Sequence, residues 1–205
     1  MNKQPSGTHD PMQLKLVLVG LGGQGVTFTT RLLAQAATVL GHSVMASEIH
    51  GMSQRGGSVI AHLKIDGDEA PLIRRGTADL LLALEPDEAV RNLSFPRRGG
   101  TVFVNAEDGL RPEVTVHLQR LHIQVWSLPA SGVALGLGSA ALANVILVGF
   151  ALAHPSLLLP IGAVRETLAA IAPRDRELNL QALDEGYRAG RAQGVNNAGR
   201  GVNQG

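Results

Sequence analysis

The segment at residues 47–59 reads SEIHGMSQRGGSV and brings several kinds of functional group into one short stretch. Arg55 can hold a phosphate or a carboxylate through two parallel hydrogen bonds. Two glycines follow it, and they let the backbone pass where the chain is tightly packed against a neighbour. The candidate contact residues of this segment are Glu48, His50, Gln54, Arg55, Gly56, Gly57 and Ser58. They could face another chain or a ligand, or they could simply build an internal loop.

A second candidate site is the turn GLGGQG at residues 20–25, which follows an apolar run and opens a helical pattern. Its glycines have the spacing GxGxxG. The first amides of a helix are unpaired and carry positive potential, so they bind phosphate or carboxylate groups well. A nucleotide, another anion or a purely structural turn all remain compatible with this spacing. The candidate residues are Gly20, Gly22, Gly23, Gln24 and Gly25.

Two residues refine the expectation for this turn. Gln24 stands where many dinucleotide-binding folds carry a small apolar residue, and its amide can hydrogen-bond a ligand or a partner. Glu48 lies 23 residues after Gly25, a position that can hold a ribose hydroxyl in a dinucleotide-binding fold. A stand-alone enzyme that binds NAD or FAD is therefore one interpretation of the chain.

Composition excludes several other classes of site. The formal net charge is +1 and 17% of residues are charged, so no basic stripe exists to bind nucleic acid. The chain has no cysteine, which excludes thiolate catalysis and Cys-ligated zinc or iron–sulfur clusters. The histidines form no HExxH pair, and no Ser-His-Asp grouping is apparent. We therefore expect no metal site and no catalytic residue in this chain.

The elements that would position these motifs alternate along the chain. This alternation predicts an α/β fold, Rossmann-like and doubly wound, with a mostly parallel sheet and helices on both faces. Residues 13–192 are expected to form a single domain between a disordered leader (1–12) and a disordered tail (193–205). The predicted strands are 14–20, 42–49, 58–65, 79–85, 101–106 and 122–130. The predicted helices are 27–41, 86–93, 139–153, 160–171 and 175–191.

The region from residue 121 to 164 has no Asp, Glu, Lys or Arg. Prolines, glycines and Asn144 interrupt it, so we expect a buried helix rather than a membrane span. That helix could be covered inside the domain or by a partner chain. The uncharged region as a whole favours a buried partner surface. The N-terminal stretch has no apolar signal core, which favours a cytoplasmic protein. His62 and Lys64 alternate along a strand and are expected on its solvated face.

The two motifs together resemble the gamma-type subunit or domain of 2-oxoacid:ferredoxin oxidoreductases. This family includes the pyruvate and ketoisovalerate enzymes and the smaller subunit of indolepyruvate oxidoreductase. The resemblance rests on the Gly-Gly-Gln-Gly turn and on the segment SEIHGMSQRGGSV. Looser agreement comes from ADLLLALEP at residues 78–86 and from Asn144 in an apolar helix. The likeness spans roughly residues 14–190.

The resemblance implies a subunit of a heteromeric enzyme, most similar to the indolepyruvate type. Such a complex decarboxylates a 2-oxoacid oxidatively, forms acyl-coenzyme A and passes electrons to ferredoxin. Thiamine diphosphate and the iron–sulfur clusters would lie on partner subunits, the main partner being a larger thiamine-diphosphate-binding chain. Residues 47–59 would then chiefly form an interface with that chain, and contact with coenzyme A is the second role considered. A structural subunit without any ligand is the remaining alternative.

Overall fold

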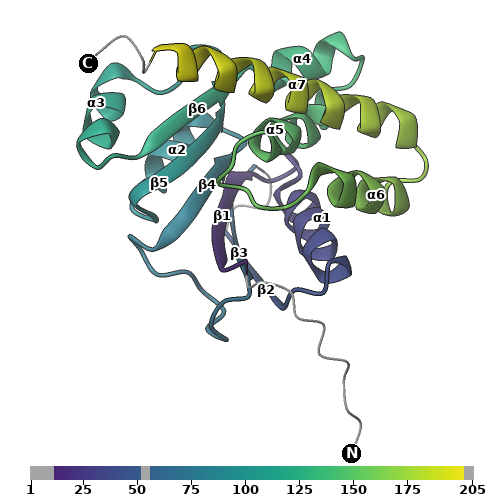
Figure 1. Ribbon diagram of the computed structural model, residues 1–205, viewed down its shortest axis with the longest axis horizontal. Helices are drawn as coiled ribbons and strands as arrows, with labels where there is room; N and C mark the ends of the chain where they lie inside the picture. Colours follow the sequence, from purple (N-terminus) through teal and green to yellow (C-terminus); the bar gives the residue numbers. More distant parts are fainter. Residues whose placement is uncertain (1–11, 52–55, 201–205) are drawn as a thin grey trace, which may run out of the picture.

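The computed structural model describes residues 12–51 and 56–200, with side chains described as far as Gly194. Within these residues, six strands form one sheet in the order β2-β3-β1-β4-β5-β6 (Figure 1). The strands are β1 (Leu14–Leu21), β2 (Val44–His50), β3 (Ser58–Ile65), β4 (Ala78–Ala83), β5 (Pro96–Asn105) and β6 (Gln124–Leu128). β1, β4, β5 and β6 run parallel, which confirms the predicted α/β fold with a mostly parallel sheet.

β3 differs from the predicted pattern, because it lies between β1 and β2 and runs antiparallel to both. The cause is the length of the connection. Only residues 51–57 join β2 to β3, whereas a parallel crossover needs roughly a dozen residues or more. β2 and β3 therefore form an antiparallel hairpin at one edge of the sheet. We call residues 51–57, of which Gly51, Gly56 and Gly57 are described, the hairpin link.

Helices cover both faces of the sheet, as predicted (Figure 1). On one face, Leu14, Leu16 and Leu18 of β1 share a buried cluster with residues of five helices. On the other face, Val17 and Val19 join a second cluster with residues of two helices. The first group is α1 (Val26–Val39), α4 (Ala130–Gly136), α5 (Ala143–Leu152), α6 (Ile161–Ile171) and α7 (Arg176–Arg200), and the second is α2 (Pro86–Arg91) and α3 (Pro112–Arg120).

α5 accounts for much of the uncharged region. All of its residues from Asn144 to Leu152 are buried. It packs beside β5 and beneath α7, so its cover comes from inside the domain. The expected buried helix is therefore confirmed, with its cover inside the domain. The partner surface expected for residues 121–164 stays a prediction for the rest of that region. Among the helices of the described residues, none is long and apolar enough to cross a membrane.

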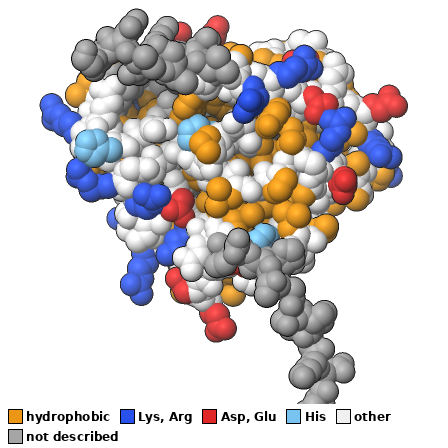
Figure 2. Space-filling view, viewed as in Figure 1, with side chains coloured by type: hydrophobic (Ala, Val, Ile, Leu, Met, Phe, Trp, Pro, Cys, Tyr) orange, Lys and Arg blue, Asp and Glu red, His pale blue; other side chains and the backbone are white. Residues whose placement is uncertain are grey.

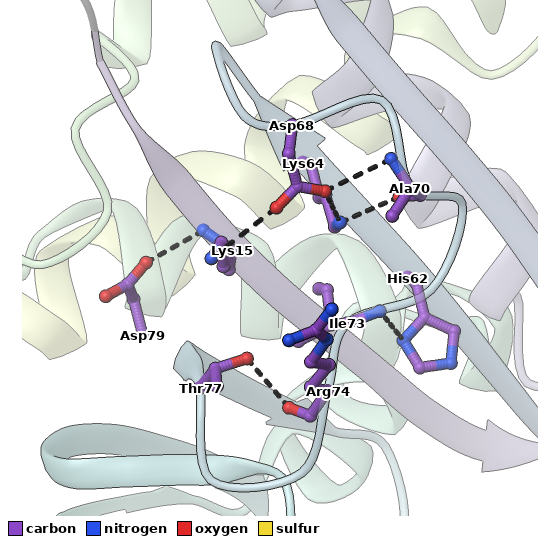
Figure 3. A network of polar contacts seen from close by, with 9 residues as sticks. All are labelled: Lys15, His62, Lys64, Asp68, Ala70, Ile73, Arg74, Thr77 and Asp79. Atoms are coloured by element: carbon purple, nitrogen blue, oxygen red, sulfur yellow. Dashed lines mark hydrogen bonds and ion pairs between the residues drawn. The ribbon is translucent and has the colours of Figure 1, made fainter.

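The prediction that His62 and Lys64 lie on a solvated face is also wrong, since they are only 2% and 3% exposed. The chain after β3 folds back over them (Figure 3). The amide of Ile73 donates to His62 Nδ1 at 3.3 Å, and Lys64 Nζ donates to the Ala70 carbonyl at 2.7 Å. Lys64 also pairs with Asp68. Burial, and next the charge of Lys64, lower the pKa of His62 below its usual value.

Asp66 fixes the end of the same hairpin to neighbouring segments. Its carboxylate accepts hydrogen bonds from the amides of Met12 and Ser43, both at 2.9 Å, and contacts His42 Nδ1 at 2.7 Å. Burial disfavours the ionised form, but the hydrogen bonds from Met12, His42 and Ser43 outweigh it. Together they lower the pKa of Asp66 to about 2.

Several element boundaries differ from those predicted. β5 begins at Pro96, before the predicted strand at residues 101–106, and its pairing with β4 has a register shift near its start. α3 and α4 (Ala130–Gly136) were not predicted, and the helix predicted at residues 139–153 is divided into a short 3₁₀ turn (Ala140–Leu142) and α5. α7 continues to Arg200, past the expected domain boundary at residue 192. The predicted leader falls almost entirely on residues 1–11, outside the described part of the chain.

Candidate functional site

The structure brings the two motifs together at the carboxyl end of β1. β1 and β3 pair so that Leu21 lies opposite Ser58. Just beyond this pair, the amide of Gly22 donates to the carbonyl of Gly57 at 2.8 Å. The glycine turn therefore contacts the hairpin link through the backbones of Gly22 and Gly57. Neither motif predicted this contact by itself.

The glycine turn requires glycine at two positions. Gly23 and Gly25 have φ angles of 94° and 88°, in the left-handed region that other residues rarely adopt. Gly25 is the N-cap of α1, and no side chain caps the helix there. A side chain on Gly25 would also collide with Asn144, whose Nδ2 atom would lie 2.2 Å from the added Cβ. The backbone amides in the first turn of α1 point toward the start of the helix. No N-cap side chain accepts a hydrogen bond from them there.

Gln24 is engaged within the chain at both ends of its amide. Its Oε1 accepts the amide of Leu21 at 2.8 Å, which closes the turn. Its Nε2 donates to Glu85 Oε2 at 3.3 Å, at the start of α2. Gly20 is pressed against the same side chain, because a Cβ there would lie 3.0 Å from Gln24 Oε1. The expected role of Gln24 toward a ligand or partner stays a prediction.

A cavity of about 590 Å³ opens beside the glycine turn. The positive end of the α1 dipole points toward it, and the guanidinium of Arg31 lies 5.9 Å from the ring centre of Phe28. Backbone amides, a guanidinium and an imidazole are the groups that bind phosphate or carboxylate. The lining includes Gly22, Gly23, Gly25, Thr27, Arg31 and His50.

Glu48 lies behind the lining of this cavity and contacts two of the residues that form it. Its Oε2 accepts a hydrogen bond from Thr27 Oγ1 at 2.9 Å and lies 3.4 Å from His50 Nε2. The carboxylate therefore ties the end of β2 to the first turn of α1, and Glu48 is not among the residues that line the cavity.

The hairpin link is fixed at both of its described ends. The amide of Gly51 donates to the carbonyl of Ser58 at 2.8 Å. Ser58 Oγ donates to Glu88 Oε2 at 2.5 Å, and Glu88 is fully buried in the first turn of α2. Gln54 and Arg55, on which much of the expected recognition depended, lie outside the described residues.

Sequence reasoning missed Glu85 and Glu88. The available signal was a pair of acids three residues apart, directly after a buried strand.

A second cavity, of about 370 Å³, lies on the other side of the glycine turn. Its polar lining includes Asn105, whose Nδ2 donates to Ser131 Oγ at 2.8 Å. Asn144 also lines it, and its Nδ2 reaches the carbonyl of Gly25 at 3.5 Å. In the part of the chain that the structure describes, no group of three or more His, Asp or Glu side chains could hold a metal ion.

Comparisons with known proteins identify the family of the chain. The family model for pyruvate ferredoxin/flavodoxin oxidoreductase matches residues 15–189. The indolepyruvate oxidoreductase subunit IorB of Archaeoglobus fulgidus is 37% identical over 86% of this chain and 94% of its own length. The IorB subunit of Pyrococcus horikoshii is 31% identical over 86% of this chain and 96% of its own. The 2-oxoglutarate synthase subunit KorC of Methanothermobacter marburgensis is 24% identical over 85% of this chain and 95% of its own length.

Solved structures share the fold. The gamma subunit of a keto/oxoacid ferredoxin oxidoreductase from Geobacter sulfurreducens superposes with a TM-score of 0.69, at 23% identity, over 87% of this chain and 99% of its own. The 2-oxoglutarate:ferredoxin oxidoreductase of Magnetococcus marinus gives a TM-score of 0.74 at 17% identity, over 90% of this chain but 32% of the larger one. The same fold thus occurs both as a separate chain and as part of a longer one. On the family match and the identity to the IorB subunits, this chain belongs to the pyruvate ferredoxin/flavodoxin oxidoreductase family.

Proposed function

We propose that this chain is the subunit without thiamine diphosphate in a heteromeric 2-oxoacid:ferredoxin oxidoreductase of the indolepyruvate type. The observation that carries the proposal is the 37% identity to an IorB subunit over 94% of that subunit's length. The 2-oxoglutarate synthase subunit KorC is more distant, at 24%. The complex would convert a 2-oxoacid to carbon dioxide and an acyl-coenzyme A and pass two electrons to ferredoxin. We place it in the cytoplasm, which suits ferredoxin as the electron acceptor.

The proposal assigns the redox centres to other subunits. Iron–sulfur clusters are held by cysteine thiolates, and this chain has none. Thiamine diphosphate would supply the carbanion chemistry of decarboxylation on the larger partner. This chain would supply recognition instead, through residues at the carboxyl end of its sheet.

The cavity beside the glycine turn fits the phosphate groups of coenzyme A. Gly22, Gly23 and Gly25 have no side chain to keep an anion away from the backbone. Arg31 adds a positive charge one turn along α1, and His50 adds a hydrogen-bonding group at the end of β2. These donors suit a polyphosphate better than an uncharged ligand.

Exposed apolar side chains support the proposed contact with a larger subunit. Ile49 is 46% exposed within the motif itself, and Leu135 of α4 is 66% exposed after the carboxyl end of β6. More apolar side chains are exposed on the face of the molecule that Figure 2 shows, near α1 and α6. There, Val39 is 74% exposed beside a groove between α1 and α6. Exposed apolar surface of this kind marks sites of association with other chains.

The proposal is tested by reconstitution. The chain is co-expressed with a larger thiamine-diphosphate-binding chain, and coenzyme A-dependent reduction of ferredoxin or a viologen dye is measured. Indolepyruvate is compared with pyruvate, 2-oxoglutarate and ketoisovalerate. We expect activity only with both chains present and the highest kcat/KM for indolepyruvate.

Two results would contradict the proposal. One is a stable complex that oxidises none of these acids. The other is thermal stabilisation of the isolated chain by NAD or FAD with no stabilisation by coenzyme A, which would favour the stand-alone dinucleotide-binding alternative.

A further inference from the structure

We propose that Glu85 and Glu88 are positioning residues which hold the two motifs of the site against each other. We call this pair the carboxylate brace. Both residues belong to the segment that opens α2 directly after β4, and β4 lies on the opposite side of β1 from β3. The inference rests on the proposed function, because it concerns the surface that would meet coenzyme A and the larger subunit.

Glu88 provides the stronger half of the carboxylate brace. Its side chain is 0% exposed, yet it carries an ionisable group. One carboxylate oxygen accepts the hydroxyl of Ser58 at 2.5 Å, and the other pairs with Arg91, which is 64% exposed. A buried carboxylate is costly unless its oxygens are hydrogen-bonded or paired. The hydrogen bond from Ser58 therefore stabilises the buried carboxylate of Glu88, and the same bond fixes the position of Ser58.

Ser58 is the point at which three segments meet. Its own carbonyl accepts the amide of Gly51, at the other end of the hairpin link. The carbonyl of the preceding residue, Gly57, accepts the amide of Gly22 in the glycine turn. A displacement of Ser58 would therefore alter both the spacing of the ends of the link and the contact between the link and the turn.

Glu85 provides the second half of the carboxylate brace. It accepts a hydrogen bond from Gln24 Nε2 at 3.3 Å, and the Oε1 atom of Gln24 in turn holds the amide of Leu21. Glu85 and Glu88 are three residues apart and so lie on one side of the start of α2. One short segment thereby contacts the glycine turn through one carboxylate and the hairpin link through the other.

A favourable interaction with the helix dipole does not explain this arrangement. An acid in the first turn of a helix gains that interaction while exposed to solvent, as Asp87 is between the two glutamates. Burial of Glu88 adds a cost that only its contacts with Ser58 and Arg91 offset. Asp87 is thus a matched control, with the same charge in the same turn but outside the carboxylate brace.

The test compares Ser58→Ala, Glu88→Gln and Asp87→Asn in the reconstituted complex, with Ser58→Thr as the variant that restores a hydroxyl. The KM for coenzyme A, kcat and the Kd for the larger subunit are measured. We expect Ser58→Ala to raise KM or Kd about tenfold, the effect of losing a hydrogen bond to a charged group. Glu88→Gln keeps a neutral hydrogen bond and should raise KM or Kd about threefold. Asp87→Asn should resemble the wild type, and Ser58→Thr should reverse most of the increase in KM or Kd that Ser58→Ala causes.

A purely structural role would lower the melting temperature and leave KM and Kd of the folded protein unchanged, and that result would overturn the inference. A second readout is independent of the proposed function. In the isolated chain, hydrogen exchange at the Gly22 amide should be faster in Ser58→Ala and Glu88→Gln than in Asp87→Asn. Unchanged exchange would overturn the carboxylate brace even if the complex is active. Faster exchange with an inactive wild-type complex would instead contradict only the proposed function.

Discussion

Replacement of Gly186 by alanine tests the packing that holds the helical layer together. α7 crosses α5 so closely that a Cβ on Gly186 would lie 1.9 Å from the carbonyl oxygen of Ile146. The contact is reciprocal, since a Cβ on Gly149 of α5 would lie 2.1 Å from the carbonyl oxygen of Leu183. Backbone therefore meets backbone, and no flexible side chain can move aside to make room.

The expected loss follows from these distances. Real Cβ contacts stay beyond 3.0 Å, so the two helices must separate by about 1 Å. Overpacking of this kind costs about 1–3 kcal/mol, and rigid backbone on both sides places Gly186→Ala at about 3 kcal/mol. Alanine recovers about 1 kcal/mol through its higher helix propensity. The net loss is about 2 kcal/mol in the free energy of unfolding, or about 4–8 °C in Tm for a chain of this size.

The assay is thermal and urea unfolding of the full chain, with Gly194→Ala as the control. Gly194 lies on the same helix, and an added Cβ there meets nothing within 4 Å. The control should therefore raise Tm by a few degrees, through helix propensity alone. A Gly186→Ala chain that unfolds at or above the wild-type temperature would refute the reasoning.

Three further predictions concern other parts of the fold. Gly25→Ala should destabilise the chain by about 1–3 kcal/mol more than Gly23→Ala in urea, because only at Gly25 does the new Cβ collide with Asn144. Asp66 has a folded-state pKa of about 2, below its unfolded value, so its contribution to stability is present above pH 4 and is lost as the pH falls toward 2. Asp66→Asn should therefore remove part of the stability difference between pH 5 and pH 2.5, and an unchanged difference would contradict the assigned hydrogen bonds. Burial and a neighbouring lysine keep the folded-state pKa of His62 below 6.5, so stability is lost as the pH falls below 6.5. His62→Gln should flatten the slope of unfolding free energy between pH 7 and pH 5, and a slope equal to that of the wild type would count against the buried neutral imidazole.

The sequence predicted the layers of the fold well, because apolar runs and glycine turns report directly on local structure. It did not predict the position of β3. Strand order depends on the short connection between β2 and β3. The composition of that connection indicated a functional site and gave no signal for the position of β3. His62 and Lys64 show the same limit. Their alternation indicated a second face of β3, but only the tertiary structure shows that residues 66–77 cover that face.

The candidate site was predicted in its parts but not in its connections. GLGGQG was correctly placed between a strand and a helix, and its contact with Gly57 follows from the pairing of β1 with β3. Glu88 could not be linked to Ser58 from sequence, because thirty residues separate them and no spacing rule relates them. Buried carboxylates are found from burial and partners, which are properties of the folded chain.

The central claim is that this chain works as one subunit of a larger 2-oxoacid oxidoreductase. Its most direct test is affinity purification of the tagged chain from its native cells, followed by identification and cofactor analysis of the proteins that remain bound. The account predicts a stoichiometric larger subunit that contains thiamine diphosphate and iron–sulfur clusters. A chain that purifies alone, without such a subunit and with bound NAD or FAD, would contradict it.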